Sequence, residues 1–262
     1  MTPLLEHKSA IIYGGGGSLG SGVARTFARE GARVFLVGRT AAPLEAAAAA
    51  VRSEGGTADH AVLDATDEAA VADHVRAVAQ EAGTVDVSFN LVSRGDVQGV
   101  ALLDIATEDL VRPVLTGLTA NFVTARAAAR QMTRQGSGVI LSLTSGSSRG
   151  AAPMMGGTGP ADGAIENMTR YLAAEVGPSG VRVVNLWTAG VADTLTDEKL
   201  AEVGGERAPK AADVVAMLSS MTTLKRAPVI AQVADTAAFL ASDRAAGITA
   251  TNVNVTCGLV LA

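Results

Sequence analysis

Cysteine and aromatic residues are scarce in this chain of 262 residues. The single cysteine, Cys257, excludes an internal disulfide, and its simplest interpretation is a small buried apolar side chain. Aromatic residues make up 3% of the chain, whereas 48% of the residues are hydrophobic. The core must therefore be built mainly from Ala, Val, Leu and Ile, and the length is sufficient for one large domain.

Basic runs and long apolar runs are also missing. The formal net charge is −5 and no Lys/Arg cluster forms a basic face, so nucleic acid is not an expected partner. No apolar stretch approaches the roughly 20 residues needed to cross a bilayer, so no membrane association is expected. Residues 1–8 lack the charged-then-apolar pattern of a signal peptide, and we expect a cytoplasmic protein.

What the chain does contain is a regular alternation of short apolar runs with longer helical patterns. Seven runs are predicted as strands: 10–13, 33–37, 57–64, 85–92, 139–143, 181–187 and 251–255. Strands that alternate with helices form parallel sheets with a helix layer on each face. We therefore predict an α/β fold, a single doubly wound parallel sheet of the Rossmann type, in one domain over residues 1–262.

The helical segments fill the intervals between these strands. They are predicted from residue 21, and over 42–52, 67–81, 107–134, 163–176 and 230–241. Thr66 is a plausible N-cap for the third helix, and Pro113 and Gly117 are expected to interrupt the fourth. Residues 190–226 differ in character, with Gly204-Gly205 and charge clusters, and are interpreted as an inserted lid.

The densest glycine cluster follows the first predicted strand. Strand, glycine turn, helix and second strand is the unit that holds a dinucleotide, because the turn approaches the pyrophosphate and helix N–H groups face it. A glycine-rich turn that only packs helix on sheet is the alternative. The residues predicted to bind the cofactor here are Gly14, Gly16, Gly17, Ser18, Leu19 and Gly20.

The end of the second strand bears on which dinucleotide binds. A carboxylate there suits the ribose hydroxyls of NAD, whereas a 2′-phosphate needs a cation. This chain has Arg39 and Thr40 at that place, and a guanidinium pairs with phosphate in a forked geometry. NADP(H) is therefore predicted in preference to NAD(H), with a solvated strand-end arginine as the alternative.

The order of these landmarks resembles the short-chain dehydrogenase/reductase family over nearly the whole chain. Val62-Leu63-Asp64-Ala65 resembles the strand end that contacts adenine, and Val85–Asn90, followed by Leu91-Val92, is similar to the fourth strand. Ala189–Thr194 takes the place of the nicotinamide loop, with Ala for Pro. The resemblance adds these cofactor-binding residues: Asp64, Ala65, Asn90, Val92, Gly190, Val191 and Thr194.

The catalytic residues of that family are largely missing. The family protonates the substrate oxygen with a Tyr whose pKa a Lys lowers, together with a Ser and an Asn. The resemblance places Ser145 at the Ser, Thr158 at the Tyr, Asp162 at the Lys and Gly117 at the Asn. No shifted alignment restores the mechanism, because the tyrosines are Tyr13 and Tyr171 and no lysine lies between residues 8 and 199.

Charged residues near the carboxyl ends of the strands are candidates to replace the missing groups. Arg94 or Arg149 would stabilise an oxyanion, and Asp96 or Asp162 would move protons if desolvation raised the pKa. The alternative for each is a surface charge, or a structural pair of Arg94 with Asp96. The predicted catalytic set is Ser145, Arg94, Asp96, Thr158 and Asp162.

No metal site is predicted, because no carboxylate or histidine cluster has ligand spacing. His7, His60 and His74 fall outside the expected active edge and are interpreted as solvated.

Three functions fit these patterns. The first is an NADP(H)-dependent oxidoreductase for a carbonyl, alcohol or activated alkene, with an atypical proton donor or water; apolar residues at 214–221 favour a hydrophobic small-molecule substrate. The second is a non-redox enzyme on the same scaffold, such as an isomerase, cyclase or dehydratase. The third is a catalytically silent subunit. The resemblance also implies a homodimer or homotetramer that pairs the two long helices after the fourth and fifth strands.

Overall fold

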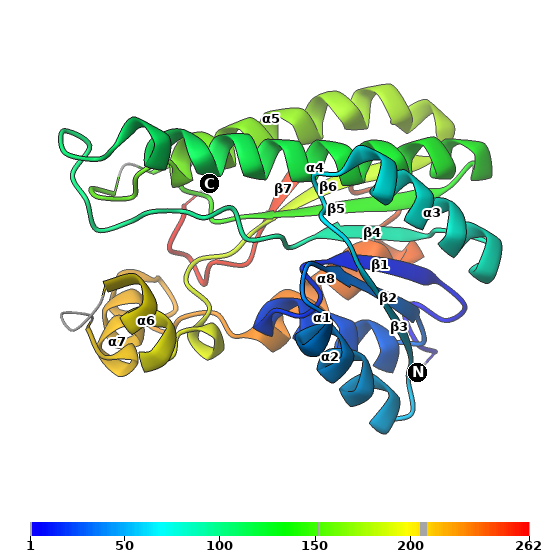
Figure 1. Ribbon diagram of the computed structural model, residues 1–262, viewed down its shortest axis with the longest axis horizontal. Helices are drawn as coiled ribbons and strands as arrows, with labels where there is room; N and C mark the ends of the chain where they lie inside the picture. Colours follow the sequence, from blue (N-terminus) through cyan, green and yellow to red (C-terminus); the bar gives the residue numbers. More distant parts are fainter. Residues whose placement is uncertain (1, 151, 205–208, 262) are drawn as a thin grey trace.

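A seven-stranded parallel sheet forms the centre of the computed structural model, which describes residues 2–150, 152–204 and 209–261. The strand order is β3-β2-β1-β4-β5-β6-β7, with the order reversing between β1 and β4 (Figure 1). The strands are β1 (Ser9–Tyr13), β2 (Arg33–Gly38), β3 (Thr57–Val62), β4 (Val87–Asn90), β5 (Gly138–Thr144), β6 (Val181–Trp187) and β7 (Thr251–Asn254). The predicted fold class is confirmed.

Three helices cover each face of the sheet. In Figure 1, α3, α4 and α5 lie above the sheet and α1, α2 and α8 lie below it. Their bounds are α1 (Ser18–Arg29), α2 (Ala41–Ser53), α3 (Glu68–Ala82), α4 (Thr107–Gln135), α5 (Thr158–Val176) and α8 (Ile230–Ala241). Side chains that alternate along β1 enter the two cores in turn: Ala10 and Ile12 face α1, and Ile11 and Tyr13 face α3 and α4.

Two helix predictions are corrected by local geometry. The N-cap of α3 is Asp67 rather than Thr66, because the Asp67 carboxylate accepts from the backbone N–H groups of Ala69 and Ala70, both at 3.0 Å. Neither Pro113 nor Gly117 interrupts α4, which is one helix from Thr107 to Gln135. Both residues are buried in it, so tertiary packing overrides their low helix propensity.

The other elements agree with the predictions apart from their ends. β6 and α8 have the predicted bounds, whereas α5 begins five residues before the predicted start at residue 163. That earlier start places Thr158 and Asp162 in the first two turns of α5. Both side chains are buried there, and they belong to the candidate site rather than to a loop.

Two further helices, α6 (Asp197–Gly204) and α7 (Ala211–Met221), lie beside the sheet layers, at the lower left of Figure 1. They fall within the predicted lid segment, although its Gly205 lies outside the described residues. The carboxylate of Asp197 ties the two helices together, since it accepts from Ala211 N at 2.7 Å and from Lys210 Nζ at 3.3 Å. No residue of α7 is buried, so its apolar side chains are not a core face.

Two predictions about single side chains are wrong. Cys257 is half-buried, not buried, and its Sγ lies 3.9 Å from Gln232 Oε1. His74 is not solvated: its Nε2 is buried on α3 with no hydrogen-bond partner in the described structure. Burial lowers the pKa of His74, and the charge of Glu81 opposes that shift. His7 is exposed, and His60 Nδ1 lies 3.2 Å from Glu45.

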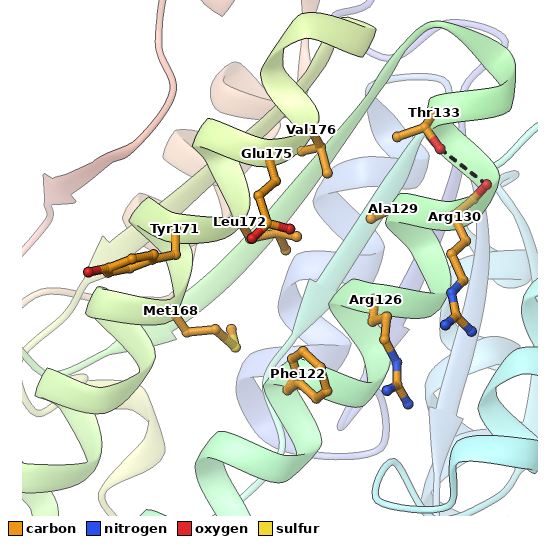
Figure 2. A pocket seen from close by; sticks show the side chains of 10 residues that line it. All are labelled: Phe122, Arg126, Ala129, Arg130, Thr133, Met168, Tyr171, Leu172, Glu175 and Val176. Carbon is orange, nitrogen blue, oxygen red and sulfur yellow. Dashed lines mark hydrogen bonds between the residues drawn. The ribbon is translucent and has the colours of Figure 1, made fainter.

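A shallow groove of about 370 Å³ runs between the outer faces of α4 and α5 (Figure 2). Phe122 of α4 and Tyr171 of α5 border it, with 42% and 70% of their surface exposed. The Arg126 guanidinium lies 4.7 Å from the Phe122 ring centroid. Exposed aromatic rings on two neighbouring helices are a feature of surfaces that bind another protein chain.

Among the helices in the described part of the chain, we find no candidate for a membrane-spanning segment, because none combines the required length with sufficient hydropathy.

Candidate active site

The glycine turn between β1 and α1 is closed by backbone contacts. Gly14 has a φ of +78° and donates its N–H to Val37 O at 2.8 Å, and a Cβ on Gly14 would lie 2.5 Å from Leu91 O. A Cβ on Gly20 would overlap the Gly14 carbonyl oxygen. α1 begins at Ser18, three residues before the predicted start, and Gly17 before it provides no side-chain cap. The first N–H groups of α1 are therefore available to a ligand.

This turn forms one wall of a cleft of about 510 Å³. The cleft lies at the carboxyl ends of β1, β2 and β4, next to the point where strand order reverses, which is where such sheets bind nucleotides. It brings together many of the predicted cofactor-binding residues: Gly14, Gly16, Gly17, Arg39, Thr40, Asp64, Ala65 and Val92.

Asp64 is the acidic group of the cleft, and it is already held by its neighbours. Its Oδ1 accepts from the N–H of Thr66 at 2.8 Å and from the Thr66 hydroxyl at 2.7 Å. These two bonds, with a smaller contribution from the positive charge of Arg39, lower the pKa of Asp64. Arg39 is exposed on the same cleft, so its charge faces the solvent-filled space there.

The remaining predicted cofactor residues lie outside the lining of this cleft. Asn90 is buried and structural, because its Nδ2 donates to Thr124 Oγ1 at 3.0 Å and its Oδ1 accepts from Val92 N at 3.1 Å. Gly190, Val191 and Thr194 follow β6, where Thr194 Oγ1 donates to Val191 O at 2.8 Å. Ser18, Leu19 and Gly20 continue the glycine turn into α1.

Asp162 is the centre of the catalytic region. Its side chain is fully buried on α5, and its Oδ2 accepts from Ser145 N at 3.0 Å, Ser145 Oγ at 2.6 Å and Ser147 N at 3.0 Å. Its Oδ1 accepts from Arg94 Nη1 at 2.7 Å. Oδ2 thus accepts three hydrogen bonds and Oδ1 accepts one from a guanidinium, which is the environment that a buried carboxylate anion requires.

These contacts also settle where the Ser145 proton goes. A carboxylate can only accept hydrogen bonds, so the Ser145 hydroxyl must donate its single proton to Asp162. In the 2.7 Å contact between the Ser145 and Ser147 hydroxyls, Ser147 must then be the donor. Ser145 therefore has no proton to give to a substrate oxygen while this network is intact.

Arg94 enters the site from the loop after β4. Its guanidinium binds Asp96 through Nε at 3.2 Å and Nη2 at 3.1 Å, in addition to Asp162. Its stem passes over Gly117 of α4, where a Cβ would lie 2.6 Å from Arg94 Cδ. Gly117, which the resemblance predicts at the family's Asn position, thus makes room for the arginine, and the alternative pairing of Arg94 with Asp96 is present.

Thr158, which the resemblance predicts at the family's Tyr position, is buried and covered by the same loop. Gln98 Nε2 donates to Thr158 Oγ1 at 3.2 Å, and Gly99 N donates to Met154 O at 2.8 Å. A Cβ on Gly156 would overlap Val97 O. The loop after β4 is therefore docked closely on the segment that leads into α5.

Sequence reasoning missed a second buried carboxylate, Glu166, one turn after Asp162. Its Oε1 accepts from Ser148 Oγ at 2.7 Å, Trp187 Nε1 at 2.9 Å and Thr144 Oγ1 at 3.3 Å. The spacing from Asp162 was a usable signal, since residues four apart share one helix face. Glu166 and Asp162 together fix the loop after β5 to α5.

Arg149 is exposed, with its guanidinium 5.7 Å from the Trp187 ring centroid, and so flanks this loop rather than entering it. Within the described part of the chain, no three His, Cys, Asp or Glu side chains are grouped as metal ligands.

Comparisons with known proteins decide the family. A family model described as enoyl-(acyl carrier protein) reductase matches residues 15–260. The chain belongs to the short-chain dehydrogenase/reductase family. It is thus an oxidoreductase of a family that binds nicotinamide cofactors.

Two relatives and one solved structure match this short-chain dehydrogenase/reductase along almost their whole length. The chain is 30% identical to the short-chain reductase protein NovJ of Streptomyces niveus, over 97% of this chain and 94% of that protein. It is 31% identical to the D-beta-hydroxybutyrate dehydrogenase of Rhizobium meliloti, over 96% and 98%. The solved structure of NAD+-bound xylitol dehydrogenase has a TM-score of 0.86 at 26% identity, over 97% and 99%.

The glycine turn of this short-chain dehydrogenase/reductase fits a dinucleotide. Side chains on Gly14 or Gly20 would fill the turn, whereas Gly17 meets only one atom, at 3.4 Å, and leaves the entrance open. Free N–H groups of α1 and the cleft beside Arg39 complete the cradle.

Proposed function

We propose that the chain is an NADP(H)-dependent oxidoreductase acting on a carbonyl, alcohol or activated alkene of a hydrophobic small molecule. The observation that carries the cofactor choice is Arg39, which follows β2 on the cleft wall where NAD-binding sites place a carboxylate. A guanidinium there pairs with a 2′-phosphate. Asp64, the acid of the same cleft, is engaged with Thr66.

Titration of the purified protein with NADPH and NADH tests this choice. We expect micromolar affinity for NADPH, with Arg39→Ala weakening NADPH by about 10-fold and leaving NADH unchanged. Arg25→Ala is the matched control, because it removes another exposed arginine, which lies on α1 and pairs with Glu54 at the C-cap of α2. Absence of NADPH binding, or equal affinity for both cofactors in the unmodified protein, would defeat the proposal.

In this function the protein positions the cofactor through main-chain groups. The N–H groups at the start of α1 bind the pyrophosphate, and Asp64 with Ala65 borders the adenine end of the cleft. A bound nicotinamide supplies or accepts a hydride. The substrate lies against the side chains of the α6–α7 lid, whose Met217 and Met221 are more than half exposed.

For the proton we propose water. The Ser145 hydroxyl donates its proton to Asp162, the Asp162 carboxylate accepts from four donors, and the Thr158 hydroxyl accepts from Gln98. NADPH oxidation with a panel of hydrophobic ketones and enones identifies a turned-over substrate. With that substrate, we expect Thr158→Val to keep turnover within about 2-fold, because a general acid contributes roughly 100-fold or more. A loss of turnover of roughly 100-fold in Thr158→Val would instead identify Thr158 as the proton donor.

The charges around Arg94 favour a second candidate function. Its one positive charge faces both Asp96 and Asp162, so little remains to stabilise an oxyanion. A silent subunit or a non-redox enzyme accommodates this arrangement. Product formation that tracks NADPH oxidation one for one would exclude both, whereas product formed without nicotinamide oxidation would identify the non-redox enzyme.

We also propose that α4 and α5 pair with a second copy of the chain, giving a homodimer or homotetramer. Support comes from the exposed Phe122 and Tyr171 beside the groove in Figure 2. Analytical ultracentrifugation should show a dimer or larger species that Tyr171→Arg converts to monomer. Tyr171→Phe is the control. A monomeric unmodified protein at micromolar concentration would rule out this assembly.

A further inference from the structure

Lys199 of α6 reaches a part of the molecule that is remote in sequence. Its Nζ donates to Ser18 Oγ at 2.9 Å, across 181 positions of the chain. Ser18 is the first residue of α1, at the entrance of the glycine turn. The ammonium group therefore lies within one hydrogen bond of the helix end that faces the dinucleotide cleft.

The segment that carries Lys199 is anchored at its base. Ala192 N donates to Pro228 O at 2.9 Å, and Ile230 N donates to Asp193 Oδ2 at 3.1 Å, so its two stems are joined. Leu218 of α7 packs on the stem residue Gly190, where a Cβ would lie 2.6 Å from Leu218 Cδ1. These contacts hold α6 on the side of the molecule where α1 begins.

The electrostatics of this contact are unfavourable without a ligand. A helix N-terminus carries a partial positive charge, and residues placed there are normally acidic or neutral. α1 has no acidic residue in its first turn and no side-chain cap, and Lys199 adds a full positive charge. An exposed bond from a lysine to a serine hydroxyl offsets little of this. An anion between the ammonium and the α1 N–H groups would satisfy both.

We propose that Lys199 is a phosphate-binding residue, which contacts the pyrophosphate of the bound dinucleotide from the α6–α7 segment. The inference rests on the proposed function, since it needs a nicotinamide dinucleotide in the cleft. Lys199 and Arg39 then divide the phosphates between them. Arg39 binds the 2′-phosphate, which only NADP(H) carries, and Lys199 binds the pyrophosphate, which NAD(H) shares.

This division predicts that the two cations affect cofactor choice differently. Dissociation constants for NADPH and NADH are measured by nicotinamide fluorescence in the full-length protein. We expect Lys199→Ala to weaken both cofactors by about 10-fold, since one charge-assisted bond is lost, and to leave their affinity ratio unchanged. Arg39→Ala should weaken the binding of NADPH alone and so reduce the preference for NADPH over NADH. Lys199→Arg, which retains a cation, should keep most of the affinity.

Lys210→Ala is the matched control, because it removes the same charge from the same segment but pairs with Asp197 rather than with α1. Its dissociation constants should stay within about 2-fold of the unmodified protein. Unchanged affinities in Lys199→Ala overturn the inference, and so does an effect confined to NADPH. If the unmodified protein binds neither cofactor, the proposed function fails instead, so the two failures are distinguishable.

Discussion

The two halves of the candidate site differ in the groups that form them, main-chain atoms in one and side chains in the other. The nucleotide half, from β1 to β2, presents main-chain N–H groups of a glycine turn, and side chains such as Arg39 and Asp64 line an open cleft beside it. The catalytic half, around β5 and α5, consists of side chains bonded to one another, with Asp162 receiving four donors. A site made of backbone needs only the glycines that permit its shape, whereas a site made of side chains changes when one partner is exchanged.

The charged residues of the catalytic half depend on one another. Asp162, which the resemblance predicts at the family's Lys position, pairs with Arg94 from the loop after β4. Gly117 provides the space that the Arg94 stem occupies. A buried carboxylate without this guanidinium would be strongly destabilising, so these residues depend on one another.

The strongest test of this dependence removes the guanidinium. Arg94→Leu leaves a fully buried carboxylate without its cation, and we expect the free energy of unfolding to fall by roughly 3–5 kcal/mol. Arg112→Leu, which breaks an exposed pair with Asp109, should change it by less than about 1 kcal/mol. Urea denaturation measures both. The double variant Arg94→Leu/Asp162→Leu should regain most of the loss, and a double variant as unstable as Arg94→Leu would contradict the argument.

In the nucleotide half, we expect substitutions to reduce cofactor affinity for a steric reason. A Cβ on Gly20 overlaps the Gly14 carbonyl oxygen, so Gly20→Val must open the turn, and NADPH affinity should fall roughly 100-fold. Gly17→Ala places its Cβ 3.4 Å from the same oxygen and should bind almost normally. Fluorescence titration compares them. Equal affinities would show that the turn does not determine binding.

A smaller effect is expected where Gly117 meets Arg94. Gly117→Asn, which introduces the family's residue, forces the Arg94 stem aside and should reduce the free energy of unfolding by roughly 1–2 kcal/mol. In an Arg94→Ala background the same substitution should be nearly neutral, because the space is then vacant. The coupling measured by this double-mutant cycle should exceed about 1 kcal/mol. Additive effects would mean that the two residues do not compete for space.

The smallest expected effect concerns the pH dependence of stability and comes from His74, which lies on α3 outside both halves of the site. Burial lowers the pKa of His74 below its ordinary value of 6.5, so the unfolded chain takes up a proton first as pH falls. The contribution of His74 to stability is complete above about pH 6.5 and declines as pH falls toward its folded pKa. His74→Gln should therefore flatten the loss of stability between about pH 7 and pH 5. An unaltered pH profile in urea denaturation would refute this.

Local patterns were sufficient to predict the sheet and the nucleotide turn. The strand at 181–187 and the glycines at 14–20 depend on contacts between sequence neighbours or on backbone freedom, which a sequence displays directly. The pairing of Arg94 with Asp162 spans 68 positions and depends on how the loop after β4 folds. Composition and spacing do not contain that loop conformation, so they predict Asp162 as a proton carrier and do not predict the four donors that its carboxylate accepts from.

Burial explains the other differences between prediction and structure. Pro113 and Gly117 are poor helix formers, yet both are buried in α4, and packing outweighs propensity there. Asp67 rather than Thr66 caps α3 because its carboxylate accepts from two N–H groups, and a one-residue choice between adjacent capping residues is not resolved by spacing. Glu166 is buried on the same face of α5 as Asp162, and its burial was not predicted although the four-residue spacing from Asp162 was a usable signal.

The close crossing of α1 and α8 has a consequence for biosynthesis. A Cβ on Gly22 would overlap Cγ2 of Ile230, so the first helix of the chain is covered by one of its last elements. During translation, the side of α1 that packs on α8 stays uncovered until about 200 further residues have left the ribosome. A nascent chain stalled before Ile230 should therefore recruit chaperones at α1 and bind no nucleotide, although its entire glycine turn has been made.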